Sequence, residues 1–314
     1  MLPSMAPAVI DELRFDSAEE FLAALSPAHP RWHPDPLTWI FRGHAESSWQ
    51  LFAKAYRVAQ RPYAPFGVDC HLDKGEQEWS VYADAEEEML ERFSRALDRA
   101  GLSTPTRALE VRRAADERTS SADTHPSAIP LLALAQHFGL PTKLLDWSRQ
   151  SRFAAYFATA DAATSPKESV DLAVWALRTD FIKSISNRPV DSAELTIQTA
   201  PASSNPNLHA QQGLFTRTQG ENAHRFPVDE FVKLAADAAQ SWTLEPWQHA
   251  AGRNPNAVGR PIMRCLRLPQ REAPKLLRLL AYEGVTGSTM FPGYEGVVRA
   301  MKEEVLWDAR RGAP

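Results

Sequence analysis

The stretch QHFGLPTKLLDWSRQSRFAAYFA, residues 136–158, decides the fold because it joins two apolar helices through a run of polar side chains. The first helix is predicted to end at Gly139, with Pro141 just beyond it as a second stop. Leu144 and Leu145 then anchor a turn in the core. So many polar groups among large apolar ones are typical of the wall of a functional site.

The polar side chains of this stretch each allow a structural and a functional interpretation. Asp146 or Ser148 is expected to cap the second helix, SRFAAYFATA, at residues 151–160. His137 lies at the end of the first helix, where a lone histidine is more often a satisfied core group than a catalytic one. A site function for any of them therefore needs support from other parts of the chain.

Upstream, the segment PLTWIFRG, residues 36–43, alternates apolar and polar positions as a strand does. Gly43 ends the strand and allows the backbone to turn or to approach a ligand. Arg42 beside it has two interpretations. It forms a structural ion pair, or its planar guanidinium binds a phosphate or carboxylate.

The rest of the chain predicts a single α+β domain with an irregular, mostly antiparallel sheet and flanking helices. A long helix is expected over residues 76–100, with the acidic cluster 86–88 on a solvated face. Polar surface insertions are expected near 102–128 and 242–261. The chain has neither a GxGxxG nor a GxxxxGK[ST] pattern, which argues against a dinucleotide-binding Rossmann domain and a P-loop.

Composition narrows the class of protein. The 314 residues carry a formal net charge of −4, which argues against a surface that coats nucleic acid. The two cysteines, Cys70 and Cys265, lie far apart and indicate a reducing compartment. We find no signal peptide, no apolar run long enough to span a membrane and no metal-ligand spacing, so we expect a cytoplasmic protein without a metal.

Several motifs in order resemble the FRG domain family. They are FRGHAESSWQL at residues 41–51, the run at 136–158, NLHAQQGLF at 207–215 and FPGYEG at 291–296. The resemblance covers roughly residues 15–305. Three positions depart from the family pattern, namely Lys143 for arginine, Ser148 for threonine and Glu295 for aspartate.

A more distant resemblance, to ADP-ribosyltransferases, implies an ADP-ribosyltransferase-like fold and NAD as a co-substrate. It implies that Arg42 holds the NAD pyrophosphate or ribose, that Ser148 organises the site and that Glu295 is the catalytic acid, with Gln211 as an alternative late polar residue. A fixed carboxylate would stabilise the positive charge that develops on the ribose. The expected NAD-binding set is Arg42, Gly43, His137, Thr142, Asp146, Trp147 and Gln211, and the expected aromatic wall is Trp147, Tyr156 or Phe41.

The acceptor, protein or nucleic acid, is not indicated by the residues, and a role as a toxin or in phage defence is an expectation only. The alternative is a non-catalytic module that binds nucleic acid or a protein partner. Its local basic groove would use two tryptophans for base stacking. That groove would consist of Arg42, Lys54, Arg57, Lys143, Arg149 and Arg152, with Trp49 and Trp147.

Overall fold

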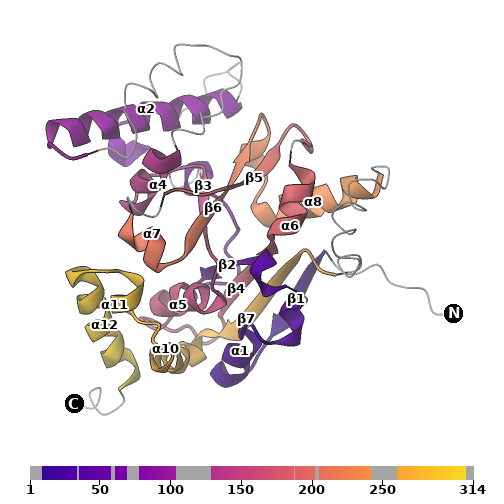
Figure 1. Cartoon of the computed structure of the whole chain (residues 1–314), viewed down its shortest axis with the longest axis vertical. Helices are drawn as coiled ribbons and strands as arrows, with labels where there is room; N and C mark the ends of the chain where they lie inside the picture. Colours follow the sequence, from indigo (N-terminus) through magenta and orange to yellow (C-terminus); the bar gives the residue numbers. More distant parts are fainter. Residues whose placement is uncertain are drawn as a thin grey trace.

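One mixed sheet organises the chain (Figure 1), in a computed structural model that describes residues 9–33, 35–57, 61–68, 78–103, 129–186, 188–201, 205–241 and 260–308. The strand order is β1-β7-β4-β2-β3-β6-β5. β1 runs parallel to β7, and every other neighbouring pair is antiparallel. The predicted α+β class with a mostly antiparallel sheet is therefore confirmed. The strands are β1 (Ile10–Arg14), β2 (Trp39–His44), β3 (Leu144–Ser148), β4 (Asp171–Arg178), β5 (Glu194–Gln198), β6 (Gly213–Gln219) and β7 (Met263–Pro269).

Helices cover both faces of the sheet, which explains why the interior of β4 is buried throughout. One face packs against α1 (Ala18–Ala24), α5 (Ser151–Ala162) and α10 (Ala273–Tyr282), and the other against α6 (Thr179–Ile185) and α8 (Val228–Ser241). A third apolar cluster joins α2 (Glu78–Arg99), α4 (Ile129–His137) and α7 (Pro206–Ala210) to β3 and β6.

The C-terminal helices α11 (Gly287–Met290) and α12 (Tyr294–Trp307) lie at the opposite end of the molecule from α2 (Figure 1). A buried contact docks them on α5. The hydroxyl of Tyr156 donates to Glu303 Oε1 at 2.5 Å, and Glu303 Oε2 accepts from the backbone N–H of Gly287 at 2.9 Å. Short 3-10 turns occupy Pro30–Trp32, Pro36–Thr38, Lys54–Tyr56, Ala64–Phe66, Ala223–Arg225 and Gln270–Glu272.

The sheet opens between β2 and β3. β2 pairs with β4 along its whole length, from Trp39↔Arg178 to His44↔Ala173. Within the described residues its register with β3 contains the single pair Phe41↔Ser148. The two strands therefore diverge after that pair, and the Arg42 side chain, rather than the backbone of β2, bonds to the Asp146 carbonyl.

Gly43 fixes how closely β2 approaches α5. A Cβ at this position would lie 1.9 Å from the carbonyl oxygen of Ala154 and 2.6 Å from the backbone nitrogen of Ala158. A real Cβ cannot approach backbone atoms so closely, so only glycine fits here. Gly43 is therefore required for the close packing of β2 against α5, whereas the sequence predicted that it lets the backbone turn or approach a ligand.

The sequence-based expectation for residues 144–148 is wrong in its secondary structure. The segment LLDWS forms strand β3, paired with β6 from Leu144↔Arg217 to Ser148↔Gly213. Asp146 and Ser148 therefore do not cap α5, whose N-cap is Gln150 without a side-chain hydrogen bond. The tertiary pairing with β6 outweighs the local signal of a capping residue.

Glu86 corrects a second expectation, because it is 1% exposed rather than solvated. Its Oε1 accepts from the backbone N–H of Lys143 at 2.7 Å. Its Oε2 lies 3.8 Å from Lys143 Nζ and 3.7 Å from Arg217 Nη2. Glu86 thus ties α2 to β3 and β6. The predicted insertions near 102–128 and 242–261 lie almost entirely outside the described residues.

Candidate functional site

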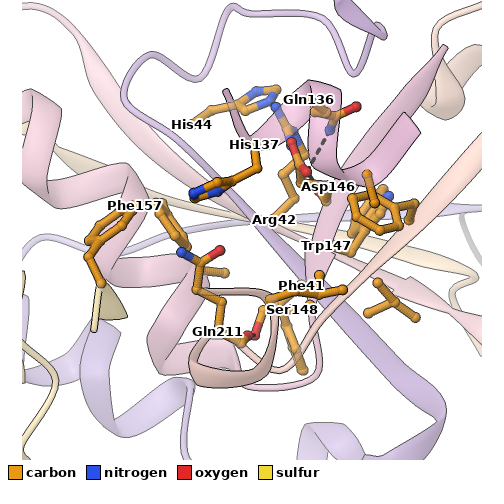
Figure 2. Close-up of a pocket in the computed structure, with 18 of the residues that line it drawn as sticks. Phe41, Arg42, His44, Gln136, His137, Asp146, Trp147, Ser148, Phe157 and Gln211 are labelled. Atoms are coloured by element: carbon orange, nitrogen blue, oxygen red, sulfur yellow. Dashed lines mark hydrogen bonds and ion pairs between the residues drawn. The ribbon is translucent and has the colours of Figure 1, made fainter. Parts of the chain in front are cut away.

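A pocket of about 460 Å³ lies where β2 and β3 diverge. Helices α4, α5, α7 and α12 complete its walls. It brings together residues that are far apart in the sequence, and Figure 2 shows their side chains converging from several elements. The predicted site residues that line it are Arg42, Gly43, His137, Asp146, Trp147, Ser148, Gln211 and Glu295. Thr142 is fully buried and is not among the lining residues.

Arg42 lies in the opening between the strands, with 17% of its side chain exposed. Its Nε donates to His44 Nε2 at 3.1 Å, and its Nη1 donates to the backbone carbonyl of Asp146 at 2.8 Å. The Asp146 carboxylate is farther away, with Oδ2 at 3.7 Å from Nη1. Within the described residues, Nη2 has no hydrogen-bond partner and remains available to a ligand.

His44 is a neutral, buried support for Arg42 that the sequence analysis did not single out. Because Arg42 Nε can only donate, His44 Nε2 must accept, and Nδ1 then donates to the carbonyl of Trp49 at 3.2 Å. Burial, and after it the positive charge of Arg42, lowers the pKa of His44 to about 3. The imidazole therefore stays uncharged at neutral pH.

The Asp146 carboxylate is 59% exposed in the pocket and is oriented from α4. Gln136 Nε2 donates to Asp146 Oδ1 at 2.6 Å (Figure 2). The Thr142 hydroxyl in turn donates to Gln136 Oε1. Thr142 thus acts on the pocket indirectly. Its hydrogen bond fixes the Gln136 amide, and this amide holds the Asp146 carboxylate.

Ser148 and Gln211 join three segments of the wall. Ser148 Oγ donates to the carbonyl of Gln211 at 2.8 Å and accepts from the backbone N–H of Gln150 at 3.0 Å. Gln211 Nε2 donates to the carbonyl of Met290 at 3.1 Å. His137, at the rim, is hydrogen-bonded through Nε2 to the side-chain amide of Asn207 at 2.8 Å.

Glu295 lies in the first turn of α12, with 73% of its side chain exposed. It forms an ion pair with Arg299 at 2.8 Å, and the Arg299 guanidinium lies over the ring of Phe291 at 4.2 Å. The N-cap of this helix is Gly293, so Glu295 is not the cap. All three side chains line the pocket, which places a carboxylate from the end of the chain in the same cavity as Arg42.

The exposed aromatic wall differs from the expected one. The indole of Trp147 is 3% exposed, packs in the core and donates through Nε1 to Thr216 Oγ1 at 2.9 Å. Tyr156 is 1% exposed and bonded to Glu303. Neither ring is accessible for stacking. Phe41, the third ring of the expected wall, is 5% exposed. Of the aromatic residues that line the pocket, Phe138 is 66% exposed, Trp49 is 47% exposed, and Phe157 and Phe291 are partly buried.

The cations of the predicted basic groove separate in space. Lys143 is buried beside Glu86, and Arg152 is paired with Glu283. Lys54 Nζ donates to the carbonyl of Gly139 at 2.5 Å. Only Arg42 and Arg57 of the proposed groove line the pocket. No sequence motif around Arg57 distinguished it from the other basic residues of the chain.

In the ranges that the structure describes, no group of three or more His, Cys, Asp or Glu side chains is arranged to hold a metal ion. None of the helices in those ranges has the length and apolar character of a membrane span.

Comparison with known families identifies the core of this region. The family model of the FRG domain matches residues 37–167. Residues 37–167 thus form an FRG domain, and this segment carries Arg42, Gly43 and the whole stretch 136–158. No curated protein and no solved structure matches the chain. The more distant resemblance to ADP-ribosyltransferases therefore stays a prediction.

Proposed function

We propose that this FRG-domain protein binds NAD in the pocket between β2 and β3 and transfers ADP-ribose from it to a protein or nucleic-acid acceptor. The observation that carries the proposal is the meeting of Arg42 and Glu295 in one cavity with exposed aromatic rings. The three residue types match the three parts of the ligand, because an arginine suits phosphate, a carboxylate suits a developing cation and a ring suits a base.

The pocket residues suggest how NAD would be held. Arg42 keeps Nη2 available for a phosphate oxygen while His44 and the Asp146 carbonyl fix the guanidinium plane. Trp49 offers a half-exposed ring in the lining of the pocket, next to His44 at a centroid distance of 6.0 Å. NAD itself supplies the activated ribose. Its C–N bond breaks, the electron pair leaves with nicotinamide, and an acceptor nucleophile takes the ribosyl carbon and releases its proton.

Glu295 is the proposed acid of the site. Its carboxylate would stabilise positive charge on the ribose more strongly in the transition state than in the ground state. Its pairing with Arg299 orients the carboxylate. Ser148 would organise the wall rather than react, since its hydroxyl is engaged with Gln211 and the backbone of Gln150.

Turnover of labelled NAD tests the proposal. We expect the wild-type protein to release nicotinamide, with transfer of label when the correct acceptor is present. Arg42→Gln and Glu295→Gln should each lower the rate by about 100-fold or more, because each removes a charged transition-state contact. Arg95→Gln is the matched control, since Arg95 is 62% exposed on α2 and does not line the pocket.

One outcome would contradict the transferase proposal. If neither nicotinamide release nor transfer is seen with protein or nucleic-acid acceptors, and salt-sensitive oligonucleotide binding is found instead, the protein is a binding module and not a transferase.

A role as a toxin or defence effector is a separate part of the proposal. An enzyme that consumes NAD or modifies a host macromolecule should inhibit growth when it is expressed. We expect strong inhibition by the wild-type protein and relief by Arg42→Gln at equal expression level. Equal growth inhibition by both proteins would contradict a toxic activity of this pocket.

A further inference from the structure

We propose that Arg57 is a second phosphate-binding group and that the pocket therefore selects ligands with two adjacent phosphates over ligands with one. This inference rests on the proposed function, since it assigns the ligand class of the same pocket.

Arg57 is held in the same manner as Arg42. It follows the 3-10 turn Lys54–Tyr56, and its Nε and Nη2 both donate to the carbonyl of Phe52, at 3.2 and 3.0 Å. Within the described residues its Nη1 has no hydrogen-bond partner. In each arginine, among the described residues, one terminal nitrogen is thus left for a ligand. Uncharged acceptors hold the other nitrogens: His44 and the Asp146 carbonyl for Arg42, and the Phe52 carbonyl for Arg57.

The charges around the two arginines are unbalanced. Burial lowers the pKa of both guanidinium groups, and the charge of Arg57 further lowers the pKa of Arg42. Asp146 is the carboxylate whose charge acts on both in the opposite direction. One of its oxygens already accepts from Gln136, and the other is 3.7 Å from Arg42. Two cations therefore share one incompletely engaged carboxylate.

The other charged groups of the pocket do not remove this excess. Glu295 is paired with Arg299, so this pair adds no net charge. His44 is uncharged at neutral pH and serves as an acceptor. Asp161 lines the pocket from α5, but among the described residues it is hydrogen-bonded to neither Arg42 nor Arg57. A ligand with two negative phosphates would balance the local charge better than a ligand with one.

The selectivity follows from the number of arginines that a ligand can reach. We assign a single phosphate to Nη2 of Arg42. A second, adjacent phosphate would add a charge-assisted hydrogen bond from Arg57, which is among the stronger polar contacts in proteins. Arg57 would then act as the residue that distinguishes a diphosphate from a monophosphate.

Calorimetric titration of the full chain with ADP, AMP and inorganic pyrophosphate at one ionic strength tests this inference. We expect the wild-type protein to bind ADP at least about tenfold more tightly than AMP. Arg57→Gln should weaken ADP binding by about tenfold and change AMP binding by less than about threefold. Arg57→Lys, which keeps the charge, should recover part of the ADP affinity, and Arg95→Gln, on the exposed face of α2, should leave both affinities unchanged.

Three results would overturn the inference: equal affinities of ADP and AMP for the wild-type protein, equal losses of both ligands in Arg57→Gln, or no ADP binding. Thermal unfolding of each variant separates a local effect from a loss of fold. The transferase proposal fails separately. Nicotinamide release that survives Arg57→Gln, without selectivity for ADP, would overturn only this inference. Selectivity for ADP without nicotinamide release would support this inference and overturn only the transferase.

Discussion

At the scale of single residues, the buried imidazole of His44 controls the direction of Arg42. The side chain is 3% exposed and connects Arg42 Nε to the carbonyl of Trp49. If this contact positions the guanidinium, its loss should weaken phosphate binding even though Arg42 remains. Two substitutions of His44 test its two ring nitrogens one at a time. The side-chain amide of glutamine lies roughly where Nε2 lies, and that of asparagine roughly where Nδ1 lies.

We therefore expect His44→Gln to retain most of the affinity for ADP, since its side-chain oxygen can still accept from Arg42. His44→Asn should lose about tenfold, because the acceptor is withdrawn. Calorimetric titration of both variants is the measurement, with thermal unfolding to verify that each is folded. Equal affinities of the two variants would show that His44 does not position Arg42.

His44 also predicts a pH dependence of stability. Its pKa is lowered from 6.5 to about 3 in the folded protein, so the unfolded chain binds more protons between these values. The stabilisation is fully present above pH 6.5 and is lost as the pH falls, at roughly 1.4 kcal/mol per pH unit. Urea unfolding at pH 7 and pH 4 should show a smaller loss for His44→Gln than for the wild-type protein. Equal losses would contradict a neutral, buried His44.

At the scale of elements, the contact between β2 and α5 depends on Gly43. Gly43→Ala should destabilise the protein by about 3 kcal/mol or more, because the added methyl group would overlap the backbone of Ala154. Gly139→Ala is the matched control. Gly139 has a φ of +85° but open space around its Cβ position, so the cost should be about 1 kcal/mol. Chemical denaturation measures both, and similar costs would contradict the close approach.

The long helix α2 provides a second test at this scale. Glu86→Gln should cost about 3–5 kcal/mol because it leaves the buried charges of Lys143 and Arg217 without their carboxylate. Glu88→Gln, on the exposed side of the same helix, removes only an i,i+4 pair with Arg92 and should cost under about 1 kcal/mol. Equal effects in urea unfolding would place Glu86 in solvent, as the sequence alone had suggested.

At the scale of the whole molecule, local patterns predicted the helices and the strand whose periodicity is clear. They placed α2, α4 and α5 and strand β2 near their observed positions. They missed β1, whose pairing with β7 joins residues more than 250 positions apart, as in Ile10↔Met263. They also missed β3, because its pairing with β6 is set by tertiary structure and not by the residues 144–148 themselves.

The candidate site shows the same limit of sequence patterns. Arg42 and the stretch 136–158 could be found because they carry recognisable motifs, and the family match includes both. Arg57 and His44 could not be distinguished from ordinary basic and core residues, since their roles depend on the opening between β2 and β3. The misassignment of Trp147 has a related cause, because strand geometry turns its indole into the core.

The central claim is that the opening between β2 and β3 is the nucleotide site, and a crystal structure of the protein with ADP-ribose tests it most directly. ADP-ribose retains the diphosphate and both riboses but lacks the bond that the enzyme would cleave. We predict density in the pocket, with phosphate oxygens within hydrogen-bond distance of Arg42 Nη2 and the adenine beside an exposed ring such as Trp49. Density at another surface, or an empty pocket at saturating ADP-ribose, would contradict the account.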